Sequence, residues 1–255
     1  MFASAELYLF PSQRLTMHLF TDEVALARQI QCSSNRVQIK VHEVPSWGWP
    51  DATLLRFRAI NEYARDINDD LACWLDADML VVRNTGDELT PKNWVNGLAF
   101  VRHPGFWRPT GGAQVQTWLK QPRALASDIL WNLTGKKPLG AWEDSDQSRA
   151  YVTAKQRRDY VCGGAWFGWT DRILQMSEVL AVRTDEDLAN SLVARWHDES
   201  HINWYLAHNA ATLLGPEYCY ERTYPHLQVI EPRIEAVNKG AEVSTARQEL
   251  NQISR

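Results

Sequence analysis

The chain of 255 residues is predicted to fold as an α/β domain with a largely parallel sheet. Strand-like and helix-like segments alternate along it, and such alternation favours parallel strands joined by helical crossovers. Hydrophobic residues make up 45% of the chain against 23% charged residues, so a sizeable core is expected. The length suits one large domain or two small ones.

Four segments are predicted to be strands. Residues 15–20 (LTMHLF) are predicted to form a strand that ends at Thr21 and Asp22. Residues 36–44 mostly alternate apolar and polar side chains, as a half-buried strand does. Residues 71–75 (LACWL) are all apolar, which predicts a buried central strand. A further strand is expected at 98–101, and the apolar, glycine-interrupted residues 160–169 are either a strand or a loop.

Helices are expected between these strands. One buried helical face is indicated by apolar residues at helical spacing, with Asp51 as its N-cap and Arg56 off the apolar stripe. This stripe consists of Leu54, Phe57, Ile60, Ala64 and Ile67. Further helices are predicted over 23–31, 124–133, 171–182 and 199–208, and a loop over 45–50.

Composition excludes several classes of protein. The net charge of −4 argues against a nucleic-acid partner, because binding to phosphates needs a basic face. No apolar run reaches the roughly 18 to 20 residues that cross a bilayer, so no transmembrane segment is expected. The first residues lack the basic stretch of a signal peptide. The cysteines lie far apart without a C-x-x-C pair, which indicates reduced thiols and a cytoplasmic location.

The chain is expected to be one domain over residues 1–240. An insertion is predicted at about 109–141, and a polar C-terminal tail at 241–255. Twelve tryptophans are many for this length. Burial in the core is the favoured interpretation of them, and platforms for sugar rings are the alternative.

Asp76 and Asp78 directly follow the apolar run 71–75. Carboxylates two residues apart at a strand end lie on one side of the chain and repel each other unless a cation lies near. Ligands bind at the carboxyl ends of strands in α/β sheets, and hard cations prefer carboxylate and phosphate oxygens. We therefore interpret the pair as a metal site that could carry a nucleotide diphosphate.

Two other interpretations of this D-A-D stretch stay open at this point. It could be a solvated turn after a strand. It could also belong to a phosphohydrolase similar to haloacid dehalogenases, with Asp76 as nucleophile and Asp78 as acid. Leu80, however, stands where those enzymes usually carry Thr or Val.

The stretch WHDESH at 196–201 precedes a predicted helix. Acids in a first helical turn are ordinary, because they complement the helix dipole. The same physics keeps a carboxylate ionised there, so Glu199 is a candidate nucleophile or stabiliser of a cation. Trp196 and His197 could offer a sugar-stacking face and hydrogen bonds.

Two weaker candidates lie elsewhere. His103 follows the strand predicted at 98–101, although a lone histidine is more often structural. Cys162 precedes Gly163 and Gly164, and paired glycines either let a backbone approach a ligand or form a bulge.

Taken together, these segments resemble glycosyltransferase family 6, which contains the histo-blood-group A and B transferases, the α-1,3-galactosyltransferases and bacterial relatives. The WHDESH stretch and its spacing from D-A-D are the most specific features. The matching stretches are FTD at 20–22, residues 49–60, WLDADM at 74–79, HPGF at 103–106, QSRAYV at 147–152, CGG at 162–164, WHDESH at 196–201, PEY at 216–218 and AVNKG at 236–240.

The resemblance implies a GT-A fold and a retaining transfer of GalNAc or Gal. The donor would be UDP-GalNAc or UDP-Gal, and the acceptor the 3-OH of a β-galactoside oligosaccharide, fucosylated or not. Glu199 would lie beside the anomeric carbon, and Asp76 and Asp78 would hold Mn²⁺ on the diphosphate. The resemblance further assigns the donor to Arg56, Asp76, Cys162, Gly163, Gly164, Asp198 and Lys239, and the acceptor to His103, Trp196, His197 and Glu221. Glycine at 164 leaves room for an N-acetyl group, which favours GalNAc.

Three departures from the family pattern matter. The opening FASAELYLF resembles the family's first helix, so the family's first strand is expected to be missing. The chain keeps D-A-D where many bacterial relatives carry N-x-N, which predicts metal dependence. Ala141 replaces a residue that often bears a hydroxyl, so the acceptor preference could differ. A non-catalytic carbohydrate-binding remnant of the family is the alternative function.

Overall fold

The computed structural model describes residues 1–237 except 87, 90, 121 and 135–139. Helix α1 (Phe2–Tyr8) comes first and is followed by the parallel pair β1 (Leu15–Thr21) and β2 (Val37–Glu43), with the short helix α2 (Val24–Ala27) between them. The α/β class is thus confirmed, and the first helix precedes the first described strand. The donor contact predicted for Lys239 and the polar tail predicted at 241–255 fall outside the described residues.

The central sheet has four strands in the order β3-β6-β5-β7. Their bounds are β3 Leu71–Leu75, β5 Leu98–Arg102, β6 Val161–Trp169 and β7 Thr212–Leu214. Strands β5 and β7 are parallel, as are β1 and β2, whereas β6 runs antiparallel to both its neighbours. The long connection from β5 to β6 allows either direction, so the sequence alone could not orient β6.

Strand β3 differs from its prediction as a buried central strand. It pairs only with β6 among the described strands, so it is an edge strand of this sheet, and all of its residues are half-buried. Its apolar side chains instead pack on both faces: Cys73 and Leu75 join one core cluster, while Ala72 and Trp74 join the other. An edge strand covered on both faces has the same apolar sequence as a central one.

The predicted helix after the 45–50 loop is divided in two. Leu55 has non-helical backbone angles and separates α3 (Asp51–Leu54) from α4 (Arg56–Glu62). Asp51 is not the N-cap, because the cap position is Pro50, which makes no side-chain capping bond. Leu54, Phe57 and Ile60 are nevertheless buried, as their spacing predicted.

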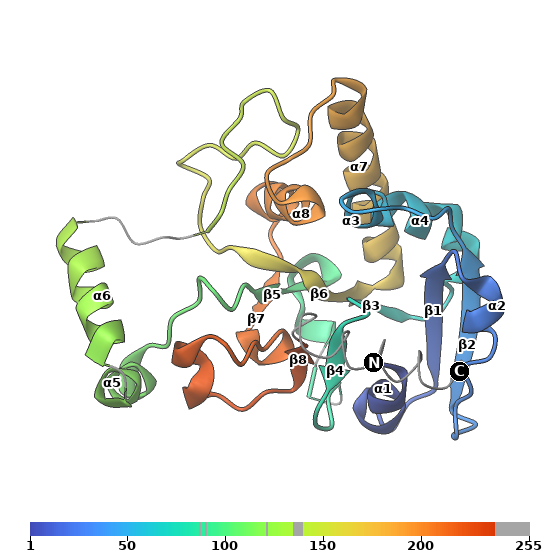
Figure 1. Ribbon diagram of the computed structural model, residues 1–255, viewed down its shortest axis with the longest axis horizontal. Helices are drawn as coiled ribbons and strands as arrows, with labels where there is room; N and C mark the ends of the chain where they lie inside the picture. The colour runs from blue at the N-terminus through green and yellow to red at the C-terminus, as the bar shows by residue number, and fades with distance from the viewer. Residues whose placement is uncertain (87, 90, 121, 135–139, 238–255) are drawn as a thin grey trace, which may run out of the picture.

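Helices and strands form two cores, one on each side of the sheet (Figure 1). Ala99 and Val101 of β5 point into the first core, and Leu98 and Phe100 into the second, as the period of two along a strand requires. The second core is covered by α4, α7 (Thr170–Ala189) and α8 (His197–His208). Both later helices are longer than the sequence predicted.

The remaining elements are short or stand apart. Strands β4 (Met79–Val81) and β8 (Ile234–Ala236) form an antiparallel pair. The turns η1 to η5 lie at Ala64–Asp66, Pro91–Asn93, Val95–Gly97, Pro216–Tyr218 and Pro225–Val229. Helices α5 (Gly111–Lys120) and α6 (Pro122–Thr134) fill the predicted insertion and stand out to one side of the sheet (Figure 1). None of the described helices is long and apolar enough to cross a membrane.

Candidate active site

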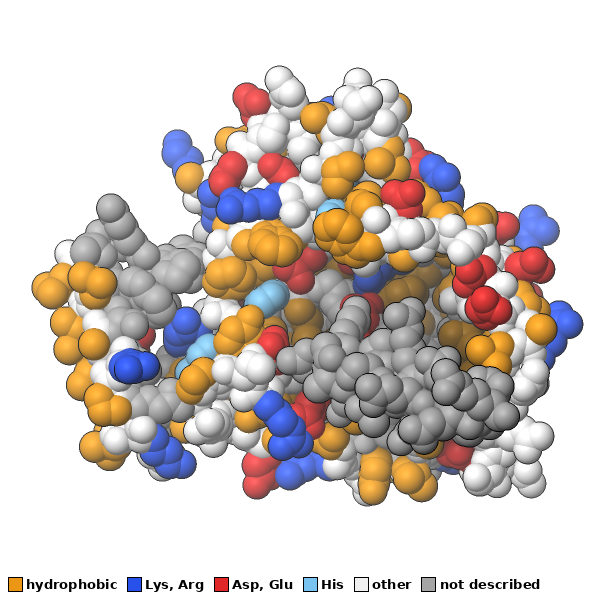
Figure 2. Space-filling view, viewed as in Figure 1, with side chains coloured by type: hydrophobic (Ala, Val, Ile, Leu, Met, Phe, Trp, Pro, Cys, Tyr) orange, Lys and Arg blue, Asp and Glu red, His pale blue; other side chains and the backbone are white. Residues whose placement is uncertain are grey.

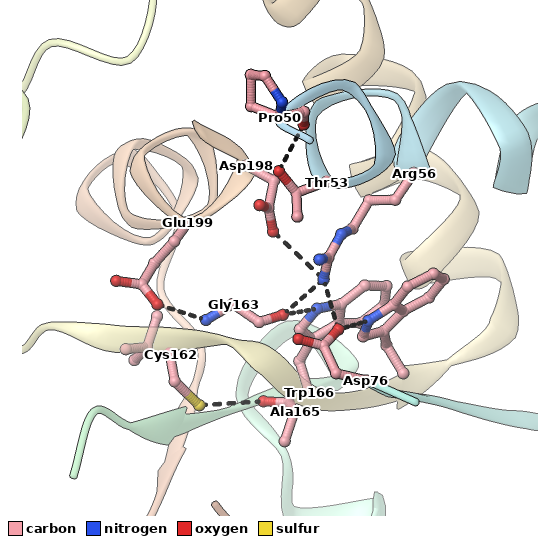
Figure 3. Close-up of polar contacts among 12 residues, drawn as sticks. Pro50, Thr53, Arg56, Asp76, Cys162, Gly163, Ala165, Trp166, Asp198 and Glu199 are labelled. Atoms are coloured by element: carbon pink, nitrogen blue, oxygen red, sulfur yellow. Dashed lines mark hydrogen bonds and ion pairs between the residues drawn. The ribbon is translucent and has the colours of Figure 1, made fainter. Parts of the chain in front are cut away.

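Arg56 joins three segments that are far apart in the sequence. Its guanidinium Nη1 lies 3.1 Å from Asp76 Oδ1, 3.3 Å from Asp198 Oδ2 and 3.0 Å from the Gly163 carbonyl oxygen (Figure 3). The side chain is only 6% exposed, and its guanidinium carbon lies 4.8 Å from the centre of the Trp74 ring. A buried cation needs such partners, which explains an arginine off the apolar stripe of α4.

Asp76 stands at the turn that ends β3. Its N–H donates to the Gly164 carbonyl, and its own carbonyl accepts the N–H of Met79, at 3.0 Å each. Trp74 Nε1 donates to Oδ1 at 2.8 Å, so this oxygen is held by both the indole and Arg56. Oδ2 faces Gly164, where a Cβ atom would lie 2.9 Å from it.

Asp78 follows two residues later on the same turn. Its carbonyl accepts the N–H of Val237 at 2.8 Å, which ties the turn to the end of β8. Two carboxylates on one turn suit a hard divalent cation whose other ligands are phosphate or water oxygens. Within the described residues, no group of three or more His, Cys, Asp or Glu side chains is placed to hold a metal. A metal here would therefore depend on ligands from the donor.

Asp198 and Glu199 lie in the first turn of α8, next to Arg56 and Gly163. Burial raises the pKa of Asp198 to about 7, with Arg56 opposing the shift and Asp76 adding to it. Burial likewise raises the pKa of Glu199 to about 7, against hydrogen bonds from Gly163 and Tyr160. The sequence predicted that the helix terminus keeps Glu199 ionised, but desolvation by burial outweighs that effect and raises its pKa toward neutrality.

Each oxygen of Glu199 has a fixed donor. The Tyr160 hydroxyl donates to Oε1 at 2.8 Å, and the Gly163 N–H donates to Oε2 at 2.9 Å. Burial raises the pKa of Tyr160, so its hydroxyl stays protonated. Sequence reasoning did not identify Tyr160 as a site residue, and its only signal is its place two residues before the C-G-G stretch.

His103 approaches Glu199 from the end of β5. Its Nδ1 accepts the N–H of Gly105 at 3.0 Å, so the proton of the neutral ring lies on Nε2. Nε2 is 4.0 Å from Glu199 Oε1. Burial lowers the pKa of His103 to about 4, although the charge of Glu221 opposes that shift. His103 is therefore a neutral donor beside Glu199.

The glycines of C-G-G pack against the acids. A Cβ on Gly163 would lie 3.0 Å from Asp198 Oδ2 and 3.2 Å from Glu199 Cβ. A Cβ on Gly164 would meet the Met79 methyl at 2.6 Å. Cys162 points the other way, into the core, with Sγ 3.9 Å from the Ala165 carbonyl (Figure 3).

The predicted acceptor residues lie at the rim of the site. Trp196 is 50% exposed, and Trp49 is 78% exposed, with its ring 4.8 Å from that of His197. Glu221 accepts a hydrogen bond from Thr223. Trp94, Trp142 and Trp166 are buried, as the core interpretation of the tryptophans expects. The interpretation of exposed tryptophans as platforms for sugar rings stays a prediction.

The chain is similar in sequence to known glycosyltransferases. Residues 130–246 match the family model described as glycosyltransferase family 6, a range that includes β6 and α8. This match supports the resemblance to that family that the sequence motifs indicated. The chain is 25% identical to histo-blood group ABO system transferase 2 of Rattus norvegicus, over 86% of this chain and 58% of the relative.

Two further relatives extend the likeness. Globoside alpha-1,3-N-acetylgalactosaminyltransferase 1 of Gallus gallus is 24% identical over 87% of this chain and 57% of the relative. Alpha-1,3-galactosyltransferase 2 of Homo sapiens is 33% identical over 47% of this chain and 37% of the relative. The chain thus spans less than two thirds of the length of these curated relatives.

Proposed function

We propose that the chain is a retaining glycosyltransferase that moves GalNAc or Gal from a UDP-sugar to the 3-OH of a β-galactoside acceptor. The observation that supports this most is the triple contact of Arg56, which joins the D-A-D turn to the acids of WHDESH. The family match supports the same reaction class. An acceptor oligosaccharide carrying fucose is included in the proposal.

The donor would lie between the D-A-D turn and the start of α8. Asp76 and Asp78 would hold Mn²⁺, which when bound would neutralise charge on the departing UDP. Arg56 and Asp198 would contact the donor sugar, and Lys239 would add a charge near the diphosphate. Because Arg56 already holds Asp76 and Asp198 in place, these groups need little rearrangement when the donor binds.

Glu199 would act beside the anomeric carbon. Positive charge develops on the sugar in an oxocarbenium-like transition state, and an ionised carboxylate lowers its energy. Tyr160 and Gly163 hold one oxygen each, so the carboxylate is oriented before the donor arrives. The Nε2–H of His103, with Trp196, His197 and Glu221, would position the acceptor.

The phosphohydrolase interpretation fits the geometry poorly. Its nucleophile would be Asp76, yet Trp74 and Arg56 both donate to Oδ1 of this residue. Donors of this kind lower the nucleophilicity of a carboxylate. We also propose a cytoplasmic location, in keeping with the four unpaired cysteines Cys32, Cys73, Cys162 and Cys219.

The test is transfer itself. The full chain is incubated with UDP-GalNAc or UDP-Gal and a fucosylated β-galactoside, with Mn²⁺ or with EDTA. We expect a product with α configuration in Mn²⁺ and little product in EDTA. Full activity in EDTA would exclude Asp76 and Asp78 as ligands of a metal that the reaction needs. Glycan binding without UDP release would instead indicate the non-catalytic remnant.

A further inference from the structure

The α5–α6 hairpin carries an apolar surface on its outer side. Leu119 is 79% exposed and Leu133 80% exposed, and Val115, Ile129 and Leu130 are also exposed. Figure 2 shows these apolar side chains gathered along the edge of the molecule where the hairpin stands out, with basic side chains beside them. Side chains four apart lie on one helix face, so Val115 and Leu119 form one row and Ile129 and Leu133 another.

The hairpin is also basic, unlike the rest of the chain. Helices α5 and α6 contain two basic residues and one acid, and two further lysines at 136–137 follow α6 in the sequence. Residues 109–141 thus carry a net charge of +3 in a chain of net charge −4. Lys120 and Arg123 are exposed at the junction of the two helices. The acid, Asp128, accepts a hydrogen bond of 2.8 Å from Trp118 Nε1, which joins α6 to α5. The Asp128 carboxylate therefore has a hydrogen-bond partner inside the hairpin.

We propose that this hairpin docks onto the surface of an anionic lipid bilayer. Exposed leucines would enter the acyl boundary while Lys120 and Arg123 contact anionic headgroups. Helices of 10 and 13 residues are too short to cross a bilayer, so they would lie along its surface. The proposal does not rest on the transfer reaction.

A second copy of the chain fits this surface less well. A two-fold dimer through the same face would bring Lys120 and Arg123 near their own equivalents. Like charges facing each other disfavour that contact, whereas anionic headgroups supply the opposite charge. Charge complementarity therefore selects the lipid surface as the occupant.

The test is co-sedimentation of the full chain with vesicles. We expect binding to phosphatidylcholine mixed with phosphatidylglycerol that is at least about tenfold tighter than binding to phosphatidylcholine alone, and that weakens with salt. The double variant Leu119→Ser and Leu133→Ser should weaken binding by about tenfold or more. The matched control, Leu26→Ser with Val182→Ser, changes exposed apolar residues elsewhere and should leave binding unchanged.

Several outcomes would overturn the proposal. One is that the protein sediments with neither kind of vesicle. Another is that the hairpin variant and the control variant lose vesicle binding equally. A dimer in sedimentation velocity that the hairpin variant dissociates, without vesicle binding, would assign the surface to a second copy. Hydrolysis of UDP-sugar by the hairpin variant is measured in parallel, so failure of docking and failure of the proposed transfer are distinguished.

Discussion

Glu199 combines burial with two hydrogen-bond donors that have fixed positions. Tyr160 and Gly163 each hold one carboxylate oxygen, and burial raises the pKa of the group to about 7. A carboxylate in this setting has little water to reorganise when positive charge develops near it. We therefore expect the catalytic role of Glu199 to depend on its negative charge. Replacement by an uncharged side chain of the same shape tests this.

Replacing Glu199 with Gln should lower kcat by about a hundredfold or more, because the amide cannot stabilise a sugar cation. The variant keeps the shape of the side chain, so the fold should persist and circular dichroism checks this. The exposed acid Glu186, which pairs with Arg149, provides the control Glu186→Gln, whose kcat should match the wild type. Unchanged turnover in Glu199→Gln would exclude Glu199 from the reaction.

Turnover should rise with pH through about 7, where Asp198 and Glu199 ionise. The contribution of Glu199 to stability should change in the opposite direction. The folded pKa of Glu199 lies near 7 against 4.5 for the ordinary group, so between these values the folded state binds more protons than the unfolded state. The stabilising contribution is therefore full below about pH 4.5 and is lost as pH rises through 7.

Urea unfolding from pH 5 to pH 8 measures this dependence. The free energy of unfolding should fall less steeply with pH in Glu199→Gln than in the wild type, because one raised group has been removed. Histidines with lowered pKa values, such as His103, contribute a rise of stability with pH in both proteins, so the difference between the two curves carries the test. The same pH dependence in Glu199→Gln and in the wild type would contradict the raised pKa of Glu199.

At the residue scale, motifs identified candidate acids but not their surroundings. Asp76, Asp198 and Arg56 lie in contact with one another, and their roles stay predictions. The hydrogen bonds that Tyr160 and the Gly163 N–H donate to Glu199 were not predicted. Tyr160 and Glu199 are 39 residues apart, and a contact over that distance leaves no local sequence pattern. The raised pKa of Glu199 could not be predicted either, because desolvation depends on the packing of several distant segments around the carboxylate.

At the scale of elements, sequence patterns located the longer strands, but they did not predict the three-residue strands β4, β7 and β8. Strands β1, β2, β5 and β6 lie within a residue or two of the predicted ranges. The break of a helix at Leu55 and the edge position of β3 depend on tertiary contacts that local patterns do not encode. Helix α5 was missed because it begins with two glycines, which usually indicate a loop.

Arg36 shows how one side chain anchors an element. Its guanidinium donates to the carbonyls of Leu9, Phe10 and Gln13 at 3.1 to 3.2 Å, just after α1 ends. Arg36→Met should lower the free energy of unfolding by about 2 kcal/mol, because these carbonyls lose a charged donor. Urea unfolding measures this, with exposed Arg28→Met as the control. Equal midpoints for both variants would contradict the anchoring role.

At the scale of the whole molecule, the sheet gathers three distant segments into one site. The turn after β3, the start of β6 and the start of α8 meet around Arg56 (Figure 3). The α5–α6 hairpin stands outside that arrangement, although it follows the strand that ends near His103. We therefore expect the hairpin to influence binding of the acceptor more than binding of the donor.

Replacing residues 110–140 with a short Gly-Ser linker should change acceptor preference more than hydrolysis of the UDP-sugar. Loops on a rigid scaffold commonly carry specificity, whereas the donor contacts proposed here lie on other segments. Initial rates with several β-galactosides, compared with the rate of UDP release in water, measure the two effects. Equal loss of both rates would mean that the hairpin is needed for the fold.

We propose that a metal-bound UDP lies at Asp76 and Asp78, opposite Glu199. Calorimetric titration of UDP into wild type and Glu199→Gln, in Mn²⁺ and in EDTA, tests this placement. We expect equal UDP affinity for both proteins in Mn²⁺, a loss of about tenfold or more in EDTA, and transfer by the wild type alone. UDP affinity that is absent in Mn²⁺, or unchanged by EDTA, would contradict it.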